Sequence, residues 1–366
     1  MIRVVSPASV RIVENRKERF VPDRNEIRPV SRCDWEDLSH RFLDHSYQQS
    51  WVYAHALAKR RHCECEHVAI DVDGELIGLA SVRVKQLPVV GGGIAYVASG
   101  PLTRLGRDDD IDRLAQCLTV LEAEYVQRRG FTLRILAPVG SPSWNSCASE
   151  SFKRTNFVPT DRSRSYRTFL LDIDRPLDDL RAGFSKYWRR NLRRAQQRDF
   201  IIRTGTTSDF FSEVGVLYQR LRGRKKFHVD LDADFYASLQ SQLSDEERFE
   251  ALIVEHDHRP VAGLVLSMLG DTCVPLVLAA DEAGLRNYAV YDLQWHSIVM
   301  AHERRLSYYD LGGIDAESNA GVYNFKKGMR GSEICAPGPF ESSPSGVIAA
   351  ITNSAERIYR RFARAA

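Results

Sequence analysis

The sequence predicts an α/β protein with mixed sheets, built from two similar halves. A β-hairpin pattern occurs twice, and each hairpin is followed by a further strand, a long helix and an apolar strand. A chain of 366 residues with 43% hydrophobic residues can bury a large core. At roughly 150 residues per domain, the length favours two domains. We therefore expect one domain at residues 1–175 and a second at residues 176–366.

The first half is predicted around a hairpin at residues 68–82. An Asp73-Gly74 pair separates two apolar runs there, and this pair is typical of tight hairpin turns. Helices are expected at residues 34–43 and 51–60, before the hairpin. After it, apolar residues at helical spacing predict a third helix, and residues 132–136 predict a buried strand. The members of that helical stripe are Ile111, Leu114, Leu118, Leu121 and Tyr125.

The second half repeats the same order of elements. Its hairpin covers residues 252–267 with a polar turn at 257–259. The preceding helices are expected at residues 209–221 and 234–243. A helix at residues 285–304 and a strand at residues 306–311 follow the hairpin.

A basic helix is predicted at the junction of the halves, over residues 181–198. Phe184, Trp188, Leu192 and Ala195 recur at helical spacing and would dock on a sheet. Between positions 181 and 203, eight Lys or Arg residues stand against one acid, although the net charge of the chain is only +3. A solvated surface is one interpretation, but the scarcity of acids favours an external anion. The residues expected to bind tRNA or phosphate are Lys186, Arg189, Arg190, Arg193, Arg194, Arg224 and Lys225.

Composition excludes several classes of protein. The longest apolar stretch, residues 263–280, is interrupted by Gly270-Asp271-Thr272 and Pro275, so we expect no membrane span. Charged residues scattered through the first 16 positions argue against a secretory signal. An odd number of cysteines, seven, without a Cys-x-x-Cys pair is typical of free thiols in a reducing compartment. We therefore expect a cytoplasmic protein.

The run from His62 to His67 contains two histidines and two cysteines and resembles a metal site at first sight. Cys63, Cys65 and His67 would share one face of a strand, and no second ligand pair follows at zinc-finger spacing. We expect a strand-entry surface here and no bound metal.

The most informative segment runs from Tyr309 to Gly328. It predicts a buried strand end, a turn at Gly312-Gly313, and a short helix that returns Lys326 toward the end of the strand. A lysine there can stabilise a developing oxyanion, whereas the alternative is an ordinary surface lysine in a Lys-Lys pair. Asp310 and Asp315 flank the turn and would either accept a proton or cap the turn.

With these elements placed, the chain resembles the Fem family of aminoacyl-tRNA-dependent peptidyltransferases. Four stretches between residues 47 and 340 carry the resemblance, and the last is the most specific. They are Tyr47-Gln48-Gln49-Ser50-Trp51, Tyr96-Val97-Ala98-Ser99-Gly100-Pro101, Arg190-Asn191-Leu192-Arg193-Arg194-Ala195, and the segment from Tyr309 to Gly328.

The resemblance implies two tandem GNAT-like acyltransferase domains. It also implies transfer of an aminoacyl group from tRNA to an amine of a peptidoglycan precursor or a peptide-like small molecule. Lys326 would stabilise the transition state in a cationic crevice between the two lobes, with Asp310 as the second catalytic candidate. The positions implied to bind substrate are Tyr96, Lys59, Trp51, Phe325, Asn319 and Gly313.

A coenzyme A thioester is the alternative donor. The loop at residues 281–288 contains a single glycine, and residues 106–110 are acidic, so neither suits a diphosphate and we expect no cofactor. A third possibility is an RNA- or peptide-binding module without activity. The sequence contains no Gly-x-Ser-x-Gly and no P-loop. It leaves the transferred amino acid, the acceptor and the oligomeric state open.

Overall fold

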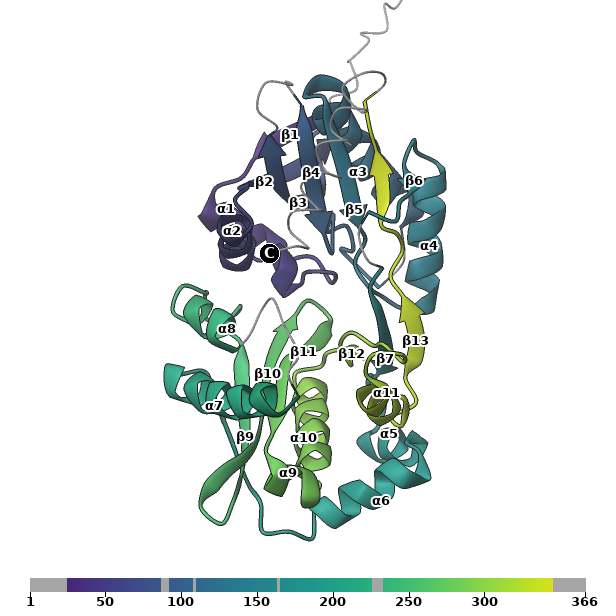
Figure 1. Cartoon of the computed structure of the whole chain (residues 1–366). Helices are drawn as coiled ribbons and strands as arrows, with labels where there is room; N and C mark the ends of the chain where they lie inside the picture. The colour runs from purple at the N-terminus through teal and green to yellow at the C-terminus, as the bar shows by residue number, and fades with distance from the viewer. Residues whose placement is uncertain (1–24, 87–91, 108–109, 163–164, 226–232, 345–366) are drawn as a thin grey trace, which may run out of the picture.

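The computed structural model describes residues 25–86, 92–107, 110–162, 165–225 and 233–344. This part of the chain forms two lobes, each built on a seven-stranded sheet (Figure 1). The strand order is β1-β2-β3-β4-β5-β14-β6 in the first sheet and β13-β7-β12-β11-β10-β9-β8 in the second. Each sheet contains one parallel pair, β4 with β5 and β11 with β12, among antiparallel pairs. The predicted mixed α/β class is confirmed.

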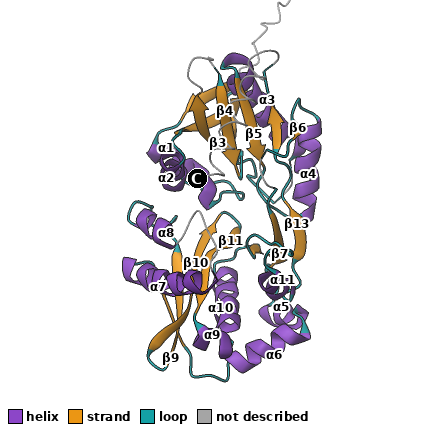
Figure 2. Cartoon of the chain, viewed as in Figure 1, coloured by secondary structure: helices purple, strands orange, loops and turns teal. Residues whose placement is uncertain are grey.

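The elements alternate along the chain, and helices flank the strands of both lobes (Figure 2). The strands are β1 (Glu26–Pro29), β2 (Glu64–Val72), β3 (Glu75–Gln86), β4 (Gly93–Ala98), β5 (Phe131–Leu136), β6 (Val158–Pro159), β7 (Arg167–Asp172), β8 (Ile201–Gly205), β9 (Glu250–His256), β10 (Arg259–Leu269), β11 (Thr272–Ala280), β12 (Tyr308–Asp310), β13 (Ser332–Cys335) and β14 (Phe340–Ser342). The helices are α1 (Arg32–Ser39), η1 (Tyr47–Gln49), α2 (Trp51–Arg60), α3 (Ile111–Glu122), η2 (Ala123–Arg128), α4 (Pro142–Lys153), α5 (Leu177–Gly183), α6 (Lys186–Ala195), α7 (Ser208–Lys225), α8 (Ala233–Gln240), α9 (Glu282–Arg286), α10 (Ala289–Glu303) and α11 (Ala320–Lys327).

Both predicted hairpins are present. The turn between β2 and β3 has φ values of 53° at Asp73 and 85° at Gly74, and that between β9 and β10 has 50° at Asp257 and 59° at His258. Two successive residues with positive φ give a turn whose twist matches that of the flanking strands. Local turn chemistry therefore fixes both hairpins.

Two predicted helices are each divided in two, and those expected at 34–43 and 234–243 end earlier, at Ser39 and Gln240. The helix expected at 285–304 is divided into α9 and α10 by Tyr288, whose φ of 65° is left-handed and cannot continue a right-handed helix. The junction helix expected at 181–198 is divided into α5 and α6. Extended backbone at Phe184 ends α5, and the Ser185 side chain caps α6 by accepting from the Trp188 amide.

The apolar face predicted for the junction helix is confirmed. Phe184, Trp188, Leu192 and Ala195 are all buried, and the first three pack in the core of the second lobe. Tyr309 of β12 is buried in the same core. The basic face of α6 is therefore held in a fixed orientation by its apolar face.

The two sheets exchange strands. β7 belongs to the second sheet although it precedes residue 175, and β14 returns from the second half to lie between β5 and β6 of the first. The domain boundary at residues 175/176 stays a prediction. In structural terms, the chain passes between the lobes once in each direction at this junction.

A buried ion pair also joins the lobes. Arg104, from the loop after β4, lies 3.0 Å from the Asp271 carboxylate in the turn between β10 and β11. The Asp44 carboxylate accepts hydrogen bonds from the backbone amides of Thr103 and Arg104, which fixes the loop. Both members of the pair are almost fully buried, so each charge depends on the other.

None of the helices in the described residues combines the length and the apolar character needed to cross a bilayer.

We predict that Asp271→Ala lowers the free energy of unfolding by about 3–5 kcal/mol, because it leaves the Arg104 guanidinium buried without its counter-ion. Urea denaturation measures the change. The matched control is Asp174→Ala, which removes an exposed interlobe pair with Arg107 and should not change the midpoint. Equal midpoints for all three proteins would contradict the prediction.

Candidate functional site

The candidate site lies where β11 and β12 separate. The two strands pair in parallel only at Thr272 with Tyr308 and at Cys273 with Tyr309. β11 then continues to Ala280 along β10, with an irregular register that leaves Leu276 unpaired. Beyond Cys273 and Tyr309 the two strands no longer pair, although the Leu311 amide still donates to the Phe169 carbonyl of β7, so a gap opens between β11 and β12.

This gap forms a cavity of about 540 Å³, which we call the lysine cavity. Its walls come from β11, the loop after β12, and helices α6, α10 and α11. Its lining includes Tyr187, Pro275, Tyr288, Gly312, Gly313, Phe325 and Lys326.

Lys326 is held against the loop that follows β12. Its Nζ atom donates to the carbonyl oxygens of Gly312 at 3.0 Å and Gly313 at 2.8 Å. An ammonium group has three N–H donors, so one remains without a partner among the described residues. The short helix α11 therefore delivers the lysine to the strand end as predicted, with one N–H available to a ligand.

The environment of Lys326 changes its acidity. Burial lowers the pKa of Lys326 from 10.5 to about 8, and the nearby Asp310 carboxylate opposes that change. Near neutral pH the group is therefore mostly protonated but close to its titration range.

Asp310, the other predicted catalytic residue, is buried within a set of donors. Its carboxylate accepts from the Tyr166 hydroxyl at 3.1 Å, from the Gly312 amide at 2.8 Å and from the Thr168 hydroxyl. Burial raises the pKa of Asp310, and these hydrogen bonds and Lys326 act in the opposite direction. The carboxylate thus fixes the turn that carries the lysine's acceptors.

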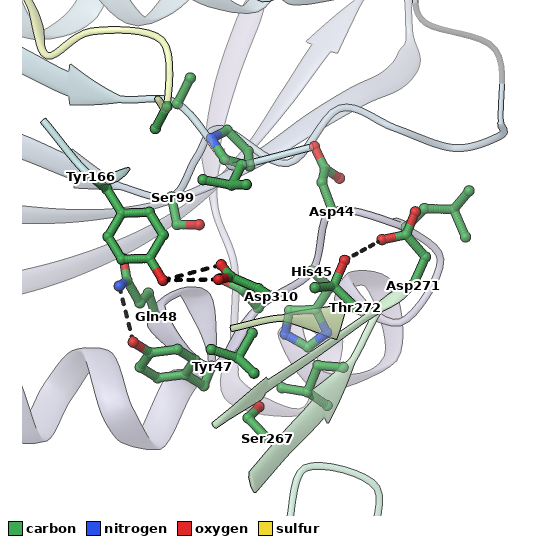
Figure 3. Close-up of a pocket in the computed structure, with 18 of the residues that line it drawn as sticks. Asp44, His45, Tyr47, Gln48, Ser99, Tyr166, Ser267, Asp271, Thr272 and Asp310 are labelled. Atoms are coloured by element: carbon green, nitrogen blue, oxygen red, sulfur yellow. Dashed lines mark hydrogen bonds between the residues drawn. The ribbon is translucent and has the colours of Figure 1, made fainter. Parts of the chain in front are cut away.

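Asp310 lines a second, smaller pocket of about 90 Å³ between the lobes (Figure 3). In Figure 3 the Tyr166 hydroxyl points at the Asp310 carboxylate, and Asp44, His45 and Asp271 lie on the other side of the pocket. Lys326 does not line this pocket. The predicted single cationic crevice is therefore wrong: the interlobe pocket is acidic, and the lysine faces a cavity of the second lobe.

Aromatic rings and arginines adjoin the lysine cavity. The Arg190 guanidinium lies 5.1 Å from the centre of the Tyr187 ring. That of Arg194 lies 5.6 Å from the Tyr288 ring and donates to its hydroxyl at 3.0 Å. Tyr187 and Tyr288 line the cavity, so the basic helix meets the cavity through these two rings.

The structure brings together some of the residues predicted to bind substrate. Gly313 and Phe325 line the lysine cavity with Lys326. Asn319 is exposed and caps α11, its side chain accepting from the Val322 amide at 3.4 Å. Asp315, the alternative proton acceptor, accepts from the amides of two residues that follow it and so caps the turn.

Three predicted substrate-binding residues lie in the first lobe and line neither pocket. Tyr96, on β4, is half-buried with the Arg83 guanidinium 5.0 Å from its ring centre. Trp51 is the first residue of α2. Lys59 is the last but one and is exposed. A role for these residues at the reacting centre stays a prediction.

The predicted phosphate-binding residues form one surface on α6. Lys186, Arg190, Arg193 and Arg194 are exposed, and Arg189 is partly exposed. Nothing is described of the side chains of Arg224 and Lys225, at the end of α7.

The sequence reasoning missed Tyr166, Thr168 and Tyr288. The first two reach Asp310 because β7 pairs with β12, with Leu170 opposite Asp310. Strand pairing over such a separation leaves no local signal. Tyr288 enters the site because its backbone is left-handed, which its residue type does not indicate.

Residues 182–327 match a family described as "Acetyltransferase (GNAT) domain". The crystal structure of FemX has a TM-score of 0.75 and 15% identity, over 90% of this chain and 100% of FemX. The Fem-like fold is confirmed. A conserved protein of unknown function from Bacteroides thetaiotaomicron VPI-5482 has a TM-score of 0.55 at 13% identity, over 88% of this chain and 100% of its own. No curated protein matches the sequence.

The Fem-like fold confirms the prediction of two tandem GNAT-like units. The matched segment begins just before α6 and ends at Lys327, so it contains α6, the lysine cavity and α11. These findings support an acyltransferase of the GNAT type whose candidate site lies in the second lobe.

We predict that Asp310→Asn lowers the pKa of Lys326 below its value of about 8, because the carboxylate favours the charged ammonium. The measurement is an NMR titration of ¹³C-methylated Lys326. Glu317→Gln removes an exposed acid from the same loop and serves as the control that leaves this pKa in place. A pKa that is identical in wild type and Asp310→Asn would show that the two groups are not coupled.

Proposed function

We propose that this protein transfers an aminoacyl group from aminoacyl-tRNA to an amine of a peptidoglycan precursor or a peptide-like small molecule. The observation that carries the proposal is the Lys326 ammonium group, which lines a cavity large enough for an acyl donor. The basic and aromatic surface of α6 adjoins this cavity and suits the nucleic acid part of the donor.

The chemistry asks for few catalytic groups. The acceptor amine attacks the ester carbonyl, a C–N bond forms, and the C–O bond to the ribose breaks. The proton that the amine loses is returned to the departing ribose hydroxyl. Since the ester is already activated, the protein must align the reactants and stabilise the oxyanion. The third N–H of Lys326 is suited to that second task.

Asp310 faces the interlobe pocket and not the lysine cavity, so we propose that it acts on the reaction through Lys326 and not as the proton acceptor. Its carboxylate favours the charged ammonium of Lys326. It also fixes the Gly312 turn, whose carbonyl oxygen holds the lysine.

Nucleic acid would be recognised by charge and stacking. Arginines on α6 can contact phosphates, and the rings of Tyr187 and Tyr288 can stack on an unpaired base. Unpaired bases at the end of a strand are the part of an RNA that such rings recognise. A tRNA acceptor end meets both requirements.

A coenzyme A thioester is the second candidate donor. One support is the match to an acetyltransferase domain. The other is the N-terminus of α10, which has no side-chain cap and begins after Tyr288, a residue that lines the lysine cavity. An uncapped helix N-terminus can bind a diphosphate. At the start of α9, in contrast, the Asp281 carboxylate already accepts from the Gly284 amide at 2.8 Å.

Donor use is decided by transfer assays with purified protein. We expect label to pass from a pool of charged tRNAs to an acceptor in cell extract, with RNase abolishing the transfer and free coenzyme A leaving it unchanged. Transfer that survives RNase and is inhibited by coenzyme A would assign the thioester donor instead.

We predict that Lys326→Ala lowers turnover at least tenfold and leaves acceptor affinity nearly unchanged. Loss of one oxyanion donor typically costs ~3–4 kcal/mol of barrier. The exposed neighbour provides the control, Lys327→Ala, which should keep wild-type turnover. Wild-type turnover in purified Lys326→Ala would remove this lysine from the mechanism. If the wild type shows no turnover and Lys326→Ala binds RNA as the wild type does, a binding module is favoured instead.

We predict that Arg190→Ala combined with Arg193→Ala weakens tRNA binding and flattens its dependence on salt. Both side chains are exposed, and each phosphate contact contributes to the slope of log affinity against log salt. The comparison is Arg128→Ala with Arg154→Ala, which removes the same charge from the first lobe, where both arginines pair with acids. The same slope in both double variants would assign the α6 arginines to structure.

A further inference from the structure

A cluster of two imidazoles and one thiol lies in the first lobe, away from both pockets. His55 comes from α2, and Cys65 and His67 come from β2. One potential ligand atom from each residue lies within 4.8 Å of the other two. His55 is exposed, Cys65 is half-buried and His67 is buried, so the cluster extends from the surface to the core.

The backbone explains the convergence. Cys65 and His67 are two residues apart in a strand, so their side chains share one face. The Cys65 sulfur lies 4.0 Å from Nδ1 of His67. α2 packs against this strand, which brings His55 to the same place. The sequence prediction of no metal considered only ligands along the strand, and the third ligand comes from a helix.

The indole of Trp51 covers both imidazoles. Its ring centre lies 4.7 Å from that of His55 and 4.1 Å from that of His67, with interplanar angles of 25° and 22°. The two imidazole planes differ by only 3°, and their centres are 5.0 Å apart. The indole therefore lies against ring faces, whereas nitrogen lone pairs project from ring edges. This arrangement orients the rings, and the Trp51 indole itself does not cover the edges that carry the lone pairs.

Hydrogen bonding leaves nitrogen atoms available. Nδ1 of His55 lies 3.0 Å from the Trp51 carbonyl oxygen, which can only accept, so Nδ1 carries the proton and Nε2 keeps its lone pair. A backbone carbonyl bound to one ring nitrogen is the usual arrangement for a histidine that binds metal through the other. His67 presents Nδ1 to the Cys65 sulfur at 4.0 Å, so Nδ1 is its ligand atom in this cluster, and its buried Nε2 has no hydrogen-bond partner among the described residues.

We propose that His55, Cys65 and His67 bind one Zn²⁺ ion. Thiolate and imidazole are the ligands that Zn²⁺ prefers, and three protein ligands leave a fourth position for water. Donor atoms around tetrahedral zinc lie roughly 3.5 Å apart. The cluster, spread over 4.8 Å, therefore needs to contract by about one ångström. The exposed His55 side chain can supply most of that movement, and the bound ion would tie α2 to β2.

The test uses the full-length protein after treatment with a chelator. We expect one Co²⁺ ion to bind per chain with a thiolate-to-cobalt charge-transfer band, and Zn²⁺ to displace it. Cys65→Ser should abolish the band, and His55→Ala should lower the affinity at least tenfold. Since His55 is exposed, its removal leaves the core intact. Zn²⁺ should also raise the Tm of the wild type and not that of Cys65→Ser.

Two neighbouring variants are the matched controls. Cys63→Ser removes the thiol two residues before Cys65, and the Cys63 sulfur lies 3.5 Å from the Ala58 carbonyl oxygen. His62→Ala removes an exposed imidazole. Both should keep the band and the affinity. Absence of binding at one ion per chain, or a band that persists in Cys65→Ser, would overturn the proposal. Equal affinity in all variants would identify only adventitious binding.

Discussion

The early end of the pairing between β11 and β12 determines the rest of the candidate site. Two residues explain why the strands separate. Pro275 on β11 has no N–H and cannot extend the ladder toward β12. Gly312 has a φ of 77°, which breaks the extended path of the chain and would strain a residue with a side chain. The Asp310 carboxylate accepts from the Gly312 amide and stabilises this turn. The cavity, the lysine's two acceptors and the position of α11 all follow from that separation.

Asp310 and Lys326 are coupled although they face different pockets. Burial disfavours the charged form of each group, raising the pKa of the acid and lowering that of the lysine to about 8. Their attraction acts in the opposite direction on both. The Gly312 backbone lies between them and is bound to both, through its amide to the carboxylate and through its carbonyl to the ammonium. A charge that enters either pocket would therefore shift the protonation of the group in the other.

The sequence was sufficient for features fixed by local chemistry. Both hairpin turns, the apolar face around Trp188 and the return of Lys326 to a strand end were predicted. What it missed depends on contacts between distant segments. The acidic interlobe pocket arises from the meeting of Asp44, Asp271 and Asp310, and the His55 cluster from the packing of a helix on a strand. The break at Tyr288 was missed because tyrosine rarely adopts a left-handed conformation.

The strand exchange bears on how the two pockets can respond to a ligand. Described residues on either side of the two crossings are joined between the lobes. The Ala336 amide donates to the Tyr166 carbonyl, and the Thr160 amide donates to the Pro339 carbonyl. Together with the buried pair of Arg104 and Asp271, these hydrogen bonds resist separation of the lobes. The pocket of about 90 Å³ between them can admit a large acceptor only if these contacts loosen. The lysine cavity lies within one lobe, so its shape does not depend on that movement.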